Sequence, residues 1–226
     1  MTLTLRYLLS WSEVWTPLIV LFFLFFRRSQ PRYLKPVIVY LILALCINLA
    51  SDIIADYKKF LPSWAQSNNP LYNLHSLTFF ICFAYFFKLL NKDHFNKFQL
   101  TILIVSFALL SFNFIYIEKI TNPDHLSGNL FTIVSYSLLI LCMLYYLNWL
   151  QDDEDDLTYE PHFWVVTGLS IYVVINFFVF LFYVPMIKED PKLADNIWNI
   201  HNIAYILLCI FIIKAFYVSP GHQLAN

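Results

Sequence analysis

Long apolar runs alternate with short polar links along the whole chain. A helix needs about 20 apolar residues to cross the hydrocarbon core of a bilayer. Seven runs approach this length, and the first is the weakest because Glu13 and Pro17 interrupt it. The pattern predicts an all-α fold, a polytopic seven-transmembrane-helix bundle in a single domain. We expect that domain to cover residues 1–226, with spans at about 9–26, 34–56, 71–90, 98–117, 127–149, 162–185 and 197–217.

Composition agrees with a membrane location. Hydrophobic residues make up 60% of the 226 positions and charged residues 13%, and the mean hydropathy is +0.63. A soluble domain carries roughly 25% charged residues, so most of this surface must face lipid. The formal net charge of −1 lacks the basic excess that nucleic-acid binding requires. We therefore expect the lipid bilayer as a partner and no nucleic acid.

Positively charged residues predict the orientation, because cytoplasmic loops carry an excess of Lys and Arg. Of the 14 such residues, eight fall on the side of the first link and six on the other. We expect the N-terminus outside and the C-terminus inside. The first group is Arg27, Arg28, Arg32, Lys35, Lys88, Lys92, Lys97 and Lys214, and the second is Arg6, Lys58, Lys59, Lys119, Lys188 and Lys192.

An acidic run, Asp152 to Asp156, would then lie in a cytoplasmic link. Five consecutive acids could recruit a basic partner or loosely hold a divalent cation. The simpler interpretation is a solvated loop, and acidic residues have little influence on topology.

A short phrase recurs at the start of two apolar runs, as Y-N-L-H-S-L at 72–77 and W-N-I-H-N-I at 198–203. Asn48 precedes His75 by 27 residues, and Asn176 precedes His201 by 25. These matches predict a 3+1+3 pseudo-repeat, in which spans 1–3 and 5–7 correspond and span four is a linker. Parallel repeats of this kind occur in transporters. A chance match among common residues remains the alternative interpretation.

Polar side chains within the spans predict a pocket, because such groups are costly in lipid unless they are paired or face a cavity. Asp52 is singled out, and His75 and His201 lie at its predicted depth. An Asp–His pair would respond to protons, whereas a hydrated Asp52 would only tie helices together. We expect a polar pocket that opens outward above an apolar plug. Its predicted lining is Asn48, Asp52, His75, Asn113, Asn129, Asn176, His201 and Tyr205.

The candidate metal ligands, if the protein binds a metal, are Asp52, His75 and His201. Two histidines and a carboxylate with an open position form a catalytic zinc set, and ceramidase-like seven-span hydrolases use such residues. The last span lacks their histidine pair one turn apart, so the enzyme question stays open and we favour neither catalysis nor a cofactor. A retinal protein is excluded, because Lys214 lies near the inner end of its span.

Transport is the first alternative to a sensor function, and an intramembrane metal-dependent hydrolase is the second. The layout resembles that of SWEET-type sugar carriers, which would imply movement of a small solute, or a proton-coupled carrier. The paired Pro-Gln signature of that superfamily is missing, and the chain contains only three Gly residues.

Three phrases carry a further resemblance: L-H-S-L-T-F-F at 74–80, F-W-V-V-T-G-L-S-I-Y at 163–172 and I-W-N-I-H-N-I at 197–203. They resemble segments of uncharacterised bacterial seven-span integral membrane proteins, which can precede signalling domains such as histidine kinases. The resemblance implies a multi-pass protein of the bacterial inner membrane. It favours a sensor or receptor-like module that signals through a cytoplasmic or membrane partner.

Overall fold

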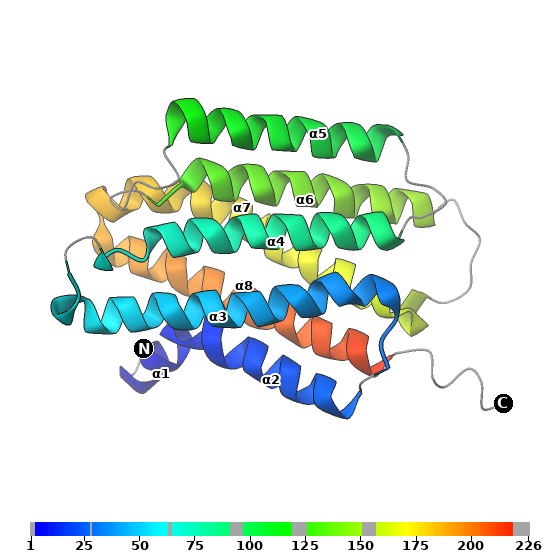
Figure 1. The fold of residues 1–226 in the computed structure, drawn as a ribbon, viewed down its shortest axis with the longest axis horizontal. Coiled ribbons are helices and arrows are strands. Elements are labelled where there is room, and N and C mark those ends of the chain that lie inside the picture. The colour runs from blue at the N-terminus through cyan, green and yellow to red at the C-terminus, as the bar shows by residue number, and fades with distance from the viewer. Residues whose placement is uncertain are drawn as a thin grey trace.

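A computed structural model describes residues 3–27, 29–62, 65–90, 97–118, 126–150 and 157–218. These residues form helices and no strand, which confirms the all-α class (Figure 1). Short 3₁₀ turns occur at Arg32–Leu34, Lys58–Phe60 and Leu157–Tyr159, and a π-helical turn occurs at Asn113–Ile117. The α-helices are α1 (Leu3–Ser10), α2 (Ser12–Phe26), α3 (Lys35–Tyr57), α4 (Asn69–Leu90), α5 (Lys97–Phe112), α6 (Gly128–Trp149), α7 (Pro161–Glu189) and α8 (Pro191–Tyr217).

Six of the described helical segments are long and apolar enough to cross a membrane, and they make this a helical membrane protein. They correspond to α3 through α8. The first predicted span is instead divided at Trp11 into α1 and α2, and α2 has only 15 residues. A seventh span therefore stays a prediction.

The last two helices extend further than their apolar runs predict. Helix α7 continues through Pro185 to Glu189, and α8 begins at Pro191 rather than near 197. Proline suits the first helical position because its missing N–H would be unpaired there anyway. The Asp190 carboxylate accepts from the backbone N–H groups of Lys192 and Leu193, both at 3.1 Å, and caps α8. These polar turns carry no hydropathy signal, so the spans looked shorter than the helices.

The helices pack in a closed ring. Helix α2 packs against α3, α3 against α4, α4 against α6, α6 against α7, and α7 against α8, which returns to α2. Helix α5 lies outside this ring and packs mainly on α6 (Figure 1). A linker between two triads would take such a place, but the duplication itself stays a prediction.

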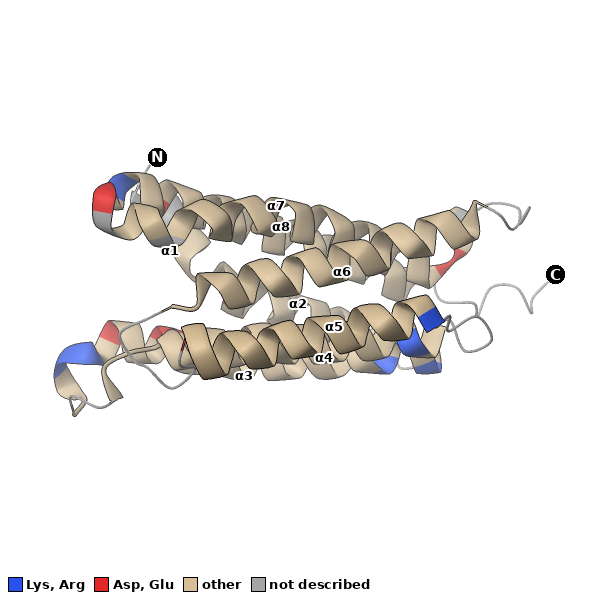
Figure 2. Cartoon of the chain, turned by 90° about the horizontal axis from the view of Figure 1, so that it is seen from above, with Lys and Arg blue, Asp and Glu red and all other residues tan. Residues whose placement is uncertain are grey.

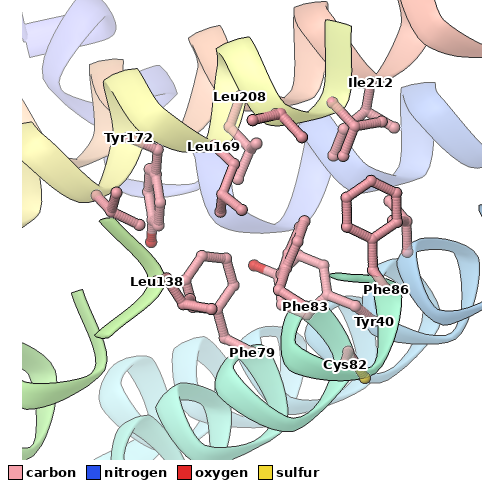
Figure 3. Close-up of a cluster of buried hydrophobic side chains, with 14 of the residues drawn as sticks. Tyr40, Phe79, Cys82, Phe83, Phe86, Leu138, Leu169, Tyr172, Leu208 and Ile212 are labelled. Carbon is pink, nitrogen blue, oxygen red and sulfur yellow. The ribbon is translucent and has the colours of Figure 1, made fainter. Parts of the chain in front are cut away.

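Large apolar side chains fill the middle of the ring (Figure 3). Phenylalanine side chains of α4 form much of this packing. The ring centroids of Phe79 and Phe83 lie 4.8 Å apart, and those of Phe83 and Phe86 lie 6.3 Å apart. Tyr40 of α3 joins them, 5.3 Å from Phe83. We call this group the aromatic core. The other labelled side chains around it are Cys82, Leu138, Leu169, Tyr172, Leu208 and Ile212.

Charged residues gather at the two ends of the bundle, and the middle of the helices is largely free of them (Figure 2). This distribution suits helices whose central parts lie in hydrocarbon. Several charges used in the orientation argument lie outside the described residues, namely Arg28, Lys92 and Lys119. The acidic run Asp152 to Asp156 also lies outside them. The orientation therefore stays a prediction.

Helices α7 and α8 approach closely at Gly168. A Cβ added there would lie 2.5 Å from the Cβ of Phe211, far inside van der Waals contact. Small residues permit such approaches between membrane helices. We expect Gly168→Leu to lower the free energy of unfolding by about 1–3 kcal/mol through overpacking, measured by denaturation in detergent micelles. Ala108→Leu on the exposed face of α5 is the matched control, and equal losses in both variants would contradict this account.

Candidate functional site

A buried polar network joins the first and last helices of the ring. His201 of α8 and Glu13 of α2 are each almost fully buried, and His201 Nε2 lies 3.0 Å from Glu13 Oε1. On the other side of the imidazole, Nδ1 lies 2.5 Å from Oδ1 of Asn176 on α7. We call these three residues the histidine network, and it ties α2, α7 and α8 together.

The hydrogen-bond pattern places the protons in this network. Asn176 Nδ2 donates to the backbone carbonyl of Tyr172 at 2.9 Å, so its Oδ1 faces His201. An amide oxygen only accepts, and His201 Nδ1 must therefore carry a hydrogen. A bare Nε2 lone pair would repel a carboxylate, so one further proton lies between Nε2 and Glu13. The pair can hold that proton on either atom.

Pro17 prepares α2 for its contact with α3. Proline has no N–H, so the carbonyl of Glu13, four residues earlier, loses its helical donor. Asn48 of α3 supplies a donor instead, with Nδ2 3.2 Å from that carbonyl oxygen. In membrane helices, side chains of neighbouring helices commonly satisfy a backbone group freed by proline. Asn48, a predicted pocket residue, thus holds the backbone next to the Glu13 carboxylate.

His75 belongs to an adjoining aromatic group. It is buried, and its Nε2 lies 3.3 Å from the hydroxyl oxygen of Tyr40. Its ring centroid is 6.4 Å from that of Tyr205, which lies 6.0 Å from Tyr172, and Tyr172 lies 5.9 Å from His201. The two predicted histidines are therefore connected through two tyrosine rings, without a direct contact between them.

A small pocket of about 10 Å³ adjoins these rings. This is close to the space that one water molecule occupies. His75, Tyr172 and Asn176 are among its lining residues. Two of the eight predicted pocket residues, His75 and Asn176, therefore line it.

Asp52 does not occupy the place that the sequence predicted for it. It is half-buried, and its Oδ2 has no hydrogen-bond partner among the described residues. It lies within electrostatic range of Glu13, but the carboxylate that contacts His201 is that of Glu13. The reason is helix packing, because α2 packs directly against α8. Sequence reasoning missed Glu13, although an acid one turn before a proline in an apolar run was an available signal.

Asn113 and Asn129 lie in a separate group between α4, α5 and α6. Asn113 Nδ2 donates to Glu118 Oε2 at 3.0 Å and to Ser127 Oγ at 3.4 Å. The Ser127 hydroxyl donates to Glu118 Oε2, and the Ser127 backbone N–H donates to Asn73 Oδ1 at 3.2 Å. Asn129 is exposed and contributes a backbone N–H 3.4 Å from Glu118 Oε1. The two predicted asparagines thus fasten the peripheral α5 to the ring.

A large cavity of about 750 Å³ lies where the N-termini of α4 and α8 meet the C-terminal turns of α7. We call it the end cavity. It lies at the end of the bundle opposite Arg27, where the sequence predicted a pocket, but none of the eight predicted residues lines it. Its lining consists of Ser10, Asn68, Asn69, Tyr72, Leu126, Tyr183, Ile187, Lys192, Asp195, Asn196, Trp198, Asn199 and Asn202.

Trp198 connects the end cavity to the histidine network. Its side chain lines the cavity, and its ring centroid is 5.0 Å from that of His201. Tyr72 and Tyr183 pack against the same indole at 5.3 and 5.0 Å. Trp198 thus lines the cavity on one side and packs on His201 of the histidine network on the other.

A second histidine group lies at the opposite end of the bundle. His162 Nδ1 is 2.8 Å from the hydroxyl oxygen of Tyr145, and Nε2 is 3.5 Å from Glu160 Oε2. The rings of Tyr33 and Trp149 also pack on this imidazole, at 5.7 and 5.5 Å. The aromatic core lies between the two histidine groups.

The candidate metal ligands do not form a metal site. Among the described residues, no group of three or more His, Cys, Asp and Glu side chains has the geometry to hold an ion. His201 has both ring nitrogens engaged by protein partners, and His75 Nε2 contacts Tyr40. An imidazole must offer a free nitrogen to ligate zinc.

The fold and site define a helical membrane protein with a polar end cavity above a buried carboxylate–imidazole pair. Comparison with known protein families, curated proteins and solved structures returns no match to this chain.

Proposed function

We propose that this chain is a membrane sensor module, in which a small polar solute enters the end cavity and a partner protein receives the signal. The observation that carries this proposal is the position of Trp198, which lines the cavity and packs on His201 of the histidine network. A solute in the cavity would press on a residue that contacts a three-helix junction. Coupling of this kind needs a ligand that interacts differently with two arrangements of the helices.

The wall of the end cavity also includes a joint between the first and last helices. Asn202 lines the cavity, and its Nδ2 donates to the backbone carbonyl of Leu9 in α1 at 3.0 Å. Ser10, the next residue of α1, lines the cavity as well. A solute that bonds to this wall would shift α8 against α1 and α2, and the Glu13–His201 contact would respond to that movement.

The proposed setting is the bacterial inner membrane, with the N-terminus outside and the C-terminus inside. The end cavity would then face the exterior. The other end of the bundle would face the partner and carries Arg27, Arg32, Lys35, Lys88, Lys97 and Lys214. The aromatic core would then separate the end cavity from the end of the bundle that faces the partner, and it would close the path between the two ends.

The test measures whether cavity occupancy changes the far end of the bundle. Spin labels at Lys88→Cys on α4 and Tyr217→Cys on α8 would report their distance in lipid nanodiscs, with exposed Cys46 replaced by Ser. We expect at least one of a set of neutral, zwitterionic, anionic and cationic solutes to shift this distance. Glu13→Gln in the same labelled protein should reduce the shift, because it removes the carboxylate from His201.

The alternative, transport, predicts a different result. Solute uptake into proteoliposomes, without a change in the label distance, would overturn the sensor proposal and favour a carrier. An unchanged shift in the Glu13→Gln protein would remove the histidine network from the signalling path.

A further inference from the structure

We propose that the end cavity binds a neutral, polyhydroxylated solute of the saccharide class. This inference rests on the proposed function, since it names the ligand of the same cavity. The cavity volume of about 750 Å³ falls in the range of small-molecule sites, with room for one or two sugar rings. Three features of the lining, its amides, its charge balance and its aromatic rings, select this chemistry.

Amide side chains dominate the polar part of the lining. Each amide offers two donors on nitrogen and an acceptor oxygen, which matches hydroxyl groups that both donate and accept. Asn202 is fully buried, and its Oδ1 has no hydrogen-bond partner among the described residues while its Nδ2 donates to Leu9. A buried polar atom without a partner is costly, so a small movement of this wall that brought a ligand hydroxyl to it would be favourable. The amides are Asn68, Asn69, Asn196, Asn199 and Asn202.

The charges of the lining cancel. Lys192 and Asp195 contribute one charge of each sign, three residues apart on the first turns of α8. Binding of an anion such as a phosphate favours clustered Arg or Lys residues. Binding of Ca²⁺ or Mg²⁺ favours several carboxylates. A wholly apolar ligand would require a lining made mainly of hydrophobic side chains, whereas eight of these 13 lining residues are Asn, Ser, Lys or Asp.

The aromatic rings supply a complementary surface. Tyr72, Tyr183 and Trp198 form one cluster in the lining, with ring centroids 5.3 and 5.0 Å from the indole. The face of an aromatic ring is apolar and carries partial negative charge. One face of a pyranose presents C–H groups that are apolar and weakly positive, so it suits such a surface. Asparagines around an aromatic cluster thus match the hydroxyl rim and the C–H face of a sugar.

Calorimetric titration of the full chain in lipid nanodiscs tests this proposal. The probes are glucose, maltose and sucrose, with glycine, glutamate and choline as zwitterionic, anionic and cationic comparisons. We expect saturable binding of at least one sugar. The double variant Asn196→Ala/Asn199→Ala should weaken that binding by about tenfold or more, because two amide hydrogen bonds are lost. Asn148→Ala, at the C-terminal end of α6, is the matched control and should bind the sugar as the unchanged protein does.

Other outcomes separate this inference from the proposed function. Binding of glycine, glutamate or choline without binding of any sugar overturns the saccharide class and leaves a ligand-binding sensor in place. Sugar binding that the double variant does not weaken overturns the assignment to this cavity. Failure of every solute to bind overturns both the ligand class and the sensor proposal.

Discussion

Glu13→Ala is expected to lower the free energy of unfolding by about 3 kcal/mol or more. The carboxylate is buried 3.0 Å from His201 Nε2, and removing one member of a buried pair of titratable side chains costs up to about 3–5 kcal/mol when the pair is ionised. The substitution would leave Nε2 of the His201 imidazole without a partner inside the ring of helices. A single hydrogen bond between membrane helices is worth only about 0.6–2 kcal/mol, so most of the expected effect comes from the buried His201 nitrogen that is left without a partner. Denaturation in mixed micelles would measure the change.

Two further variants distinguish the pair from its surroundings. Glu13→Gln keeps a hydrogen-bonding group next to His201 and should cost about 1 kcal/mol. Asp56→Asn removes an exposed carboxylate of α3 and should change stability by less than about 0.5 kcal/mol. If Glu13→Ala and Asp56→Asn lowered stability equally, the Glu13–His201 contact could not hold the first and last helices together.

Phe83→Ala is expected to cost about 3 kcal/mol through the cavity that it leaves in the aromatic core. The side chain is fully buried and lies 4.8 Å from Phe79 and 5.3 Å from Tyr40 between ring centroids (Figure 3). Buried Phe→Ala changes in proteins cost about 3–5 kcal/mol. We expect the lower part of this range, because in lipid the loss comes from packing rather than from transfer into water. The same denaturation assay applies.

Phe107→Ala is the matched control for the aromatic core. Phe107 lies on the peripheral α5, and its side chain is 69% exposed, where lipid tails would replace the lost contacts. We expect a change below about 0.5 kcal/mol. A loss as large as that of Phe83→Ala would mean that the exposed face of α5 is packed against something more rigid than lipid.

Most of the helices could be predicted from sequence because their signals are local. Runs near 20 apolar residues, with Pro and Asn at their borders, place the spans at 34–56 and 71–90 close to Lys35–Tyr57 and Asn69–Leu90. The first run was different. Its helix is divided at Trp11. Polar residues next to Trp11, together with Pro17 further along the same apolar run, leave the length of the span ambiguous.

The site was harder to predict because it depends on which helices touch. The sequence places Asn176 and His201 in one predicted pocket lining without pairing them, and in the structure they hydrogen-bond to each other. The corresponding Asn48 and His75 take other partners, Glu13 and Tyr40. No periodicity within a single helix reports that α2 lies beside α8. Glu13 was therefore treated as a break in an apolar run rather than as the partner of a histidine.

The Glu13–His201 contact also has a consequence for biosynthesis. The two residues are 188 positions apart, and synthesis at roughly 5–20 residues per second takes on the order of 10–40 s to cover that distance. Throughout this interval the Glu13 carboxylate of α2 has no imidazole partner, and burying it alone in lipid would be costly. The nascent chain must therefore keep Glu13 hydrated or protonated until the last helix arrives. Closure of the ring is consequently a late, post-insertional step of biogenesis.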